Sequence, residues 1–388
     1  MVEWIECKIS DIGTVVGGAT PSTKKAENYE GGNIAWITPK DLSTLSGRYI
    51  KCGERNITEI GLKSCSTQLL PENTVLFSSR APIGYVAIAA NEVCTNQGFK
   101  SVIPNGATDP LFLFYLLKHN KDKIEAMGSG TTFKEVSGNT MKNIMVRVPS
   151  DKEVQKNIAS MLGTLDDKIE GNERINNNLL QQAQTLYKDC FVDMRPFDGD
   201  MPTDWHLGTV SEIIELHDSK RIPLSSRERA DLAKIYPYYG ATSVMDYVDR
   251  YLFDGIYLLL GEDGTVVDSK GFPILQYVEG KFWVNNHAHI ITGKNGFTVE
   301  TLYLLFSLTN VRSIVTGAVQ PKISQANLNK VPVIIPSEAE LSTFDSIIQP
   351  IFAQIRNLRT ENDRLAATRD TLLPRLMSGE LNVSDLDL

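Results

Sequence analysis

A long internal repeat constrains the fold of this chain more than any other feature of its sequence. The stretch VSGNTMKNIMVRVPS (136–150) aligns with ISQANLNKVPVIIPS (323–337) at a constant offset and without gaps. Both copies share an early serine, the apolar positions that follow it and a final Pro-Ser. Isolated residues outside these stretches recur as well (Gly130 and Gly317; Trp4, Ile9 and Ile12; Trp205, Val210 and Ile213). A repeat of this length predicts one structural unit that is used twice.

Each copy is followed by a segment with the periodicity of a long helix. Residues 151–190 contain no proline, and residues of one seam recur every seven positions (Ile158, Leu165, Asn172, Leu179 and Leu186). The end of the chain repeats the pattern (Ile351, Leu358, Leu365 and Leu372). Sustained heptads predict a coiled coil. Because neither helix can bury its apolar stripe alone, we expect the two helices to pair antiparallel, although each could instead pack on its own domain.

Polar residues and prolines refine this prediction. Asn176 and Asn362 fall on each other when the two helices are aligned, and both lie inside the apolar seams. A buried asparagine costs stability but fixes the register of a coiled coil, so these two are our candidates for that role. Pro350 lacks an amide hydrogen, which predicts a kink or the true start of the second helix, and Pro374 predicts an end or a bend of this helix near Leu373.

The predicted fold is therefore mixed α/β, with two globular domains that alternate with two long helices. We expect domains at residues 1–150 and 196–337 and helices at 151–195 and 338–388. In the first domain NTVLFSSRAPIGYVAIA predicts two strands around a polar turn, and GIYLLLGEDGTVV predicts the same in the second.

Composition excludes several classes of protein. The 388 residues carry a net charge of −8, and the five cysteines form no CxxC pair, which favours a reducing cytoplasm over a disulfide framework. No apolar run approaches a membrane span, and the N-terminus does not resemble a secretory signal. The acidic total argues weakly against nucleic acid, but the first 150 residues are mildly basic. No catalytic motif of the GxSxG, P-loop or dinucleotide type is present.

The stretch KFWVNNHAHIITG raises the possibility of a metal site. His287 and His289 lie two residues apart on a predicted strand and so would share a face. Together with Glu262 and Asp263 they would suit a metal-dependent hydrolase. In the first copy, however, Asn96-Gln97 aligns with Asn286-His287, and Phe99 aligns with His289. Because the possible ligands are not duplicated, we predict no metal, and we expect His289 to be packed and hydrogen-bonded.

The polar residues between the predicted strands are instead typical of side chains that contact DNA. Asparagine and glutamine can read adenine, arginine and lysine can bind guanine or phosphate, and hydroxyls can bind the backbone. For any one of them, a solvated or fold-stabilising role remains an alternative. The candidates are Ser79, Arg80, Thr95, Asn96, Gln97, Lys100 and Lys134 in the first domain, and Lys220, Arg221, Tyr239, Asn286, His287, Gln320 and Lys322 in the second.

The whole organisation resembles the specificity subunit of type I restriction-modification systems. Local strings that resemble this family are IAWITPKDL, TNQGFKSVIP, YPYYGATS and GAVQPKISQANL in the domains, and LDDKIEGNERINNNL and ENDRLAATRDTLLPRLMSGEL in the helices. The resemblance covers nearly the whole chain.

The resemblance implies a non-catalytic, cytoplasmic subunit. Each target-recognition domain would read one half of a bipartite double-stranded DNA sequence, and the helices would set the spacing and dock two modification (methyltransferase) subunits. S-adenosylmethionine, and ATP with magnesium where restriction subunits join, would bind only to those partners. A metal-dependent hydrolase and a coiled-coil protein-interaction adaptor remain the alternatives.

Overall fold

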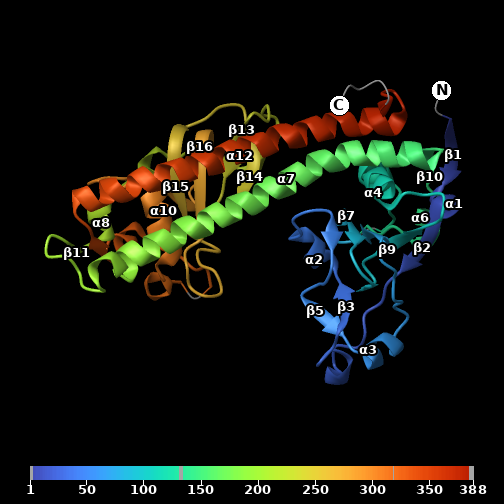
Figure 1. Cartoon of the computed structure of the whole chain (residues 1–388), viewed down its shortest axis with the longest axis horizontal. Helices are drawn as coiled ribbons and strands as arrows, with labels where there is room; N and C mark the ends of the chain where they lie inside the picture. Colours follow the sequence, from blue (N-terminus) through green and yellow to red (C-terminus); the bar gives the residue numbers. More distant parts are fainter. Residues whose placement is uncertain (1–2, 131–133, 318, 384–388) are drawn as a thin grey trace. The chain divides into compact units, whose positions relative to one another are not determined.

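The computed structural model describes residues 3–130, 134–317 and 319–383, which divide into two compact units. The first unit combines the residues up to Glu173 with those from Arg359, and the second unit is Arg174–Leu358. Each unit contains one mixed α/β domain and a part of each of two long helices (Figure 1). No helix of the described ranges is long and apolar enough to cross a membrane.

The first unit is built around a five-stranded sheet. Its strand order is β2 (Gly13–Gly17), β9 (Lys100–Pro104), β6 (Val75–Ser79), β7 (Ile83–Ala89) and β4 (Tyr49–Ile50). All neighbours are antiparallel except β4 and β7, which are parallel. A smaller sheet has the order β5 (Arg55–Ile57), β3 (Ile34–Ile37) and β8 (Cys94–Thr95).

Helix α4 (Pro110–His119) contacts this sheet at β6 and β7. Its first turn is stabilised by the Asp109 carboxylate, which accepts a hydrogen bond from the Phe112 amide, and by a proline at the first position. The run from Phe112 to Leu117 is buried on every side, as expected of a uniformly apolar helix. The other helices are short: α1 (Ile9–Ile12), α2 (Pro39–Ser43), α3 (Glu59–Lys63), α5 (Lys121–Ala126) and α6 (Gly138–Asn143).

The second unit repeats this architecture. Its sheet has the order β12 (Ile214–Leu216), β17 (Ala288–Gly293), β15 (Phe253–Gly261), β16 (Leu275–Val284), β13 (Tyr236–Tyr239) and β14 (Val244–Val248). The parallel pair recurs, because β13 runs parallel to β16 as β4 does to β7. Helix α10 (Val299–Leu308), capped by Thr298, takes the place of α4. The short helices are α8 (Val210–Ile213), α9 (Ser226–Ala230) and α11 (Gln325–Leu328). The repeat predicted from sequence is thus confirmed in the strand order.

Each unit also contains a separate two-stranded antiparallel sheet. In the first unit β1 (Trp4–Lys8) pairs with β10 (Met145–Pro149), and in the second β11 (His206–Thr209) pairs with β18 (Pro332–Ile335). Next to each sheet the same backbone hydrogen bond recurs, from Ile9 to Ile144 (3.0 Å) and from Val210 to Val331 (2.9 Å). These bonds bound what we call the first head (residues 9–144) and the second head (residues 210–331).

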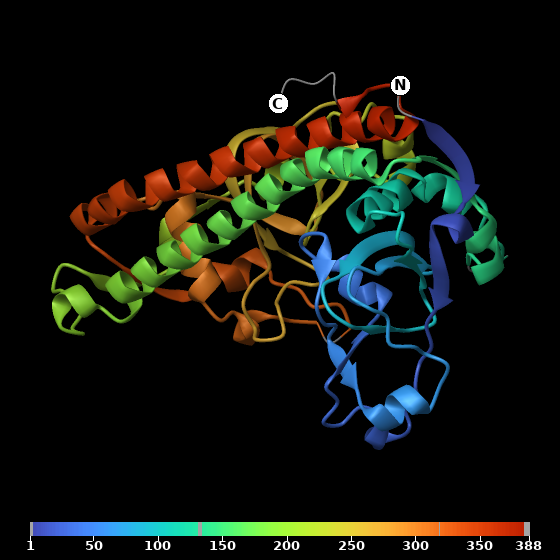
Figure 2. The ribbon, with the colours of Figure 1, turned by 45° about the vertical axis from the view of Figure 1, so that its right-hand side comes forward.

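The long helices are α7 (Lys152–Tyr187) and α12 (Glu338–Ser378), and they lie side by side in both views (Figures 1 and 2). Their pairing is antiparallel. In the first unit Asp166 meets Arg369 and Asn172 meets Asn362, and in the second unit Tyr187 packs edge-on against Phe344. The predicted antiparallel coiled coil is confirmed.

Some local predictions were wrong. Helix α12 begins at Glu338 and runs to Ser378, so Pro350 does not mark its start and Pro374 does not end it. Ile348 and Phe352 stay buried on each side of Pro350. A kink or bend at either proline stays a prediction. The residues after the turn at Gly264 do not form a second strand. They make isolated bonds to the segment just before β16 instead, with the Ile274 amide donating to the Val266 carbonyl at 2.9 Å, while the Gly264 amide of the turn donates to the Pro321 carbonyl at 2.9 Å.

Candidate functional site

In the first head, three segments far apart in sequence meet where β6 ends and β9 begins. The Ser79 amide donates to the Gly98 carbonyl at 2.7 Å, and the Val136 amide donates to the Ser79 carbonyl at 3.0 Å. The Glu135 carboxylate lies between two cations, 3.3 Å from Lys100 Nζ and 3.7 Å from an Arg80 nitrogen. Arg80 and Lys100 therefore meet around Glu135 at the ends of two neighbouring interior strands.

The second head builds the same junction with the same backbone hydrogen bonds. The Glu262 amide donates to the His287 carbonyl at 2.8 Å, and the Ile323 amide donates to the Glu262 carbonyl at 2.8 Å. These bonds show that Glu262 takes the place of Ser79 and His287 takes the place of Gly98.

A side-chain turn confirms this correspondence. Asn96 Oδ1 accepts a hydrogen bond from the Gly98 amide at 2.8 Å, and Asn285 Oδ1 accepts one from the His287 amide at 2.8 Å. Asn285 therefore corresponds to Asn96, and His289 corresponds to Lys100. The sequence alignment was wrong by one position here, because backbone hydrogen bonds rather than residue similarity set the register. Neither histidine recurs in the first head in either alignment.

The predicted contact residues of the first head differ in accessibility. Gln97 and Lys134 are exposed, Arg80 is partly exposed, and Lys100 is mostly covered. Asn96 is half-buried and engaged in its turn. Ser79 and Thr95 are buried, and the Ser79 hydroxyl donates to the Gly98 carbonyl at 3.1 Å, so in this structure they support the loops rather than face a ligand.

In the second head Lys220, Asn286, Gln320 and Lys322 are exposed, and His287 is partly exposed beside Asp263. Tyr239 is half-buried and packs edge-on against Phe282. Arg221 is largely covered and held by carboxylates, so in this structure its role is structural. Which of these residues contact DNA stays a prediction.

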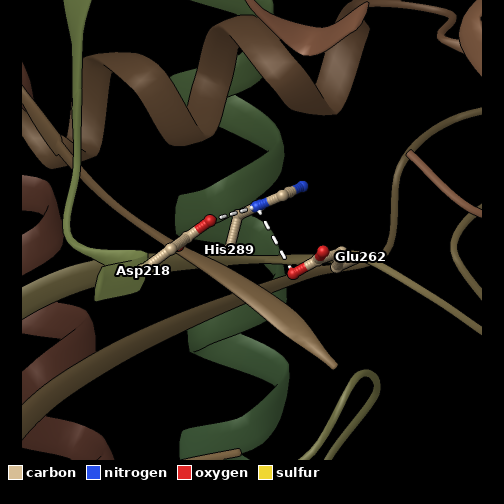
Figure 3. A group of neighbouring side chains, drawn as sticks. All are labelled: Asp218, Glu262 and His289. Atoms are coloured by element: carbon tan, nitrogen blue, oxygen red, sulfur yellow. Dashed lines mark hydrogen bonds and ion pairs between the residues drawn. The ribbon is translucent and has the colours of Figure 1, made fainter. Parts of the chain in front are cut away.

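Asp218, Glu262 and His289 form a largely buried cluster that includes Glu262 of this junction (Figure 3). One potential ligand atom from each residue lies within 4.8 Å of the others, as in a metal site. His289 Nδ1 lies 2.6 Å from Asp218 Oδ2 and 3.7 Å from Glu262 Oε2. Sequence reasoning missed Asp218, because its closeness to His289 depends on the tertiary fold.

The hydrogen bonds of His289 argue against a metal. Its Nδ1 faces the Asp218 carboxylate, and its Nε2 faces the Ile323 carbonyl at 2.8 Å. Both ring nitrogens therefore already have hydrogen-bond partners within the protein, and a cation at either nitrogen would have to replace one of them. The prediction that His289 is packed and hydrogen-bonded is confirmed.

Two cations already neutralise the carboxylates of this cluster. Arg221 Nη1 lies 2.5 Å from Glu262 Oε2, and Lys322 Nζ lies 3.2 Å from Glu262 Oε1. Asp218 receives further hydrogen bonds from the Ile290 amide (2.9 Å) and the Gln325 amide group (2.5 Å). The cluster is a hydrogen-bonded ion network that ties the loops of the second head together, and the metal-hydrolase alternative is not supported.

The ionisation of Asp218 adds to this network. Burial alone would raise the pKa of Asp218, but hydrogen bonds from His289, Ile290 and Gln325 and the charge of His289 outweigh it and lower the pKa below the usual 3.8. A lowered carboxylate pKa stabilises the folded state at neutral pH, and this contribution is lost as the pH falls through the folded pKa.

Replacing Asp218 with asparagine is therefore expected to destabilise the second unit by about 3 kcal/mol at neutral pH, because it leaves buried donors without their anion. The difference from the wild-type chain should shrink at acidic pH, below the usual carboxylate pKa of 3.8, as Asp218 becomes protonated in the folded chain. Urea unfolding at both pH values measures this. The exposed Asp231→Asn in the same head serves as the control. An equal loss at both pH values would contradict the assigned ionisation.

The helix seam contains an asparagine pair. Asn172 Nδ2 donates to Asn362 Oδ1 at 2.8 Å and also lies 2.7 Å from Glu361 Oε2. Asn176 Oδ1 is buried and has no hydrogen-bond partner among the described residues. Asn172 was visible in the heptad seam, but only the structure pairs it with Asn362. The register role of Asn176 and Asn362 stays a prediction, with Asn172 as the observed partner of Asn362.

Comparison with known proteins agrees with this architecture. The family model described as "Type I restriction modification DNA specificity domain" matches residues 1–181 and 202–367. The chain is 34% identical to the type I restriction enzyme MjaIX specificity subunit of Methanocaldococcus jannaschii, over 99% of this chain and 95% of that protein. It is 22% identical to the EcoprrI specificity subunit of Escherichia coli, over 95% of this chain and 91% of that protein.

A solved structure shows the same fold. The S subunit of a type I restriction-modification system from M. genitalium superimposes with a TM-score of 0.56 at 18% identity, over 97% of this chain and 96% of that chain. Each matched family region covers one head and most of the helix that follows it, so the sequence, the fold and the relatives agree. The chain belongs to the family of type I restriction-modification specificity subunits.

Proposed function

We propose that this chain reads a bipartite DNA sequence, one half with each head, and that its paired helices set the distance between the halves. The observation that carries the proposal is the repeated junction: in both heads the same backbone hydrogen bonds join the ends of two neighbouring strands to a third segment, in the stretches of sequence that hold the polar candidates. Two equivalent junctions with different side chains suit two readings of different bases by one scaffold. The name of the matching family model supports the same function.

The polar candidates in these stretches of the two heads have suitable chemistry. Glutamine and asparagine at Gln97 and Asn286 can pair with base edges, and lysines at Lys134 and Lys220 can bind phosphates. Arg80 and Lys322 pair with carboxylates, so DNA phosphates would compete with Glu135 and Glu262 for them. The net charge of −8 favours a complex in which partner subunits supply part of the phosphate binding.

The proposal assigns the chemistry to other subunits. The helices would dock two modification subunits that bind S-adenosylmethionine and methylate adenine, and restriction subunits would add ATP- and magnesium-dependent cleavage. This chain would be the non-catalytic part of that complex. A coiled-coil adaptor without DNA recognition is not supported by the comparisons, since the matching family model is a DNA specificity domain.

The test is co-expression with the cognate modification subunit, followed by mapping of methylated adenines. We expect one bipartite sequence with a fixed spacing. Arg80→Ala and Lys220→Ala should each weaken DNA binding by about tenfold, whereas the exposed Lys156→Ala on α7 should leave it unchanged. Methylation without sequence preference, or equal effects of all three substitutions, would contradict the proposal.

A further inference from the structure

The first head contacts helix α7 through a buried arginine. Arg48 is 5% exposed, and its Nε lies 3.1 Å from Glu170 Oε1. The guanidinium also pairs with Asp167, and Nη1 donates to the Gly163 carbonyl at 3.2 Å. The neighbouring Ser46 hydroxyl donates to Glu173. Across this interface, which we call the first dock, these head groups donate and α7 accepts.

The charge of Arg48 is maintained despite its burial. Burial alone would lower the pKa of Arg48, but Tyr115, Glu170 and Asp167 raise it above its ordinary value. A charge that is removed from water in this way depends on its partners, because a buried ion without a counter-ion is strongly destabilising. The first dock therefore needs an acidic helix surface.

The second head contacts helix α12 with the opposite polarity, in what we call the second dock. Arg356 of α12 places Nη1 3.1 Å from Glu300 Oε1 and Nε 3.5 Å from Glu279 Oε2. The same Nη1 lies 2.5 Å from the Tyr277 hydroxyl oxygen. Gln349 of α12 donates to Glu300 Oε2 at 3.0 Å, and Glu300 is 3% exposed. In this set of contacts the helix donates and the carboxylates of the head accept.

The two docks use the same positions of the repeat. When the two long helices are aligned so that Asn176 corresponds to Asn362, Glu170 corresponds to Arg356 and Gly163 corresponds to Gln349. When α4 and α10 are aligned at their N-cap residues, Asp109 and Thr298, Leu111 corresponds to Glu300.

The contacts between these positions also correspond. A Cβ at Gly163 would lie 3.2 Å from Leu111 Cδ2, and Gln349 bonds Glu300. Equivalent positions therefore meet in both docks, but their charges differ. On the helix, Glu170 of the first dock corresponds to Arg356 of the second, and on the head, Leu111 corresponds to Glu300.

We propose that the two head–helix interfaces are charge-keyed, so that each head docks on its own helix and is rejected by the other. On the wrong helix Arg48 would face Arg356, and Glu300 and Glu279 would face Glu170. Like charges held close together in a water-poor interface repel strongly, and such repulsion gives specificity against a wrong partner. These opposite charges determine which head can dock on which helix, and this pairing does not depend on what the heads bind.

A double-mutant cycle tests the key in the first dock. Arg48→Glu and Glu170→Arg are each expected to lower the melting temperature of the first unit by about 10 °C, and the double substitution should regain at least about half of the summed loss. Glu153→Lys, in an exposed ion pair of the same helix, should change it by less than about 2 °C. If a charge reversal prevents folding, the milder Arg48→Gln and Glu170→Gln cycle gives the same coupling. If the losses of melting temperature in the two single variants simply added up in the double variant, the proposal would be overturned.

An exchange of heads tests the specificity. Residues 9–144 and 210–331 are interchanged, once on native helices and once with Gly163→Gln, Glu170→Arg, Gln349→Gly and Arg356→Glu. The first chain is expected to melt about 10 °C or more below the wild type, and the second to recover much of that loss. An exchanged chain that is as stable as the wild type on native helices would overturn the proposal. So would an exchanged chain that gains nothing from the helix substitutions, including one that folds in neither form.

Discussion

Replacing residues 9–144 with the corresponding residues of another family member is expected to change one half of the DNA target and leave the other half intact. The first head has its own sheet and a hydrophobic cluster made of head residues alone, and the Ile9–Ile144 hydrogen bond lies where its two ends join the two-stranded sheet. The second head belongs to the other compact unit. Binding to the original sequence should fall by about 10³-fold or more, the usual difference between specific and non-specific DNA binding.

The replacement should keep the helix contacts of the first dock, with Ser46, Arg48, Leu111 and Tyr115 retained in the incoming head. Methylation mapping of the hybrid complex then shows which half has changed. The matched control replaces residues 210–331 in the same way and should change the other half. If either hybrid altered both halves, the heads would not read DNA independently.

Lengthening both helices by one heptad is expected to widen the gap between half-sites without changing their sequences. The insertion points are between Glu173 and Arg174 in α7 and between Leu358 and Arg359 in α12, where the two compact units divide. A heptad at these points keeps the contacts within each unit and preserves the phase of the apolar seam. Seven residues add about 10 Å of helix, the length of about three base pairs.

Selection from DNA with spacers of random length measures the preferred gap. The control inserts a heptad into α7 alone, which misaligns α7 and α12 and should destabilise the pair rather than lengthen the gap. An unchanged spacing in the doubly extended chain would show that the helices do not set the distance between the half-sites.

Most of the architecture could be predicted because it depends on periodic burial. The heptads gave both long helices and their antiparallel pairing, since an apolar stripe must be covered along its whole length. The prolines did not mark the ends of α12, which continues past both of them. A proline removes one amide donor, and Ile348 and Phe352 are nevertheless buried on both sides of Pro350.

The candidate site could be predicted only in part. Amides and cations between strands were recognisable as possible DNA contacts, but accessibility was not. Ser79, Thr95 and Arg221 have the right chemistry and yet are buried or held by neighbours. Burial of a polar residue depends on which distant segments cover it, and a local pattern does not record that.

The sequence alone determined that this protein is a duplicated head-and-helix unit without a catalytic motif, because repeats, heptads and motifs are properties of residue order. Tertiary structure decided the rest. It paired His289 with Asp218 in an ion network, matched Asn172 to Asn362, and showed that the first and second docks meet with opposite charges. These contacts join residues that lie from tens to about two hundred positions apart. Their geometry follows from strand register and helix packing, which the order of residues encodes only through the whole fold.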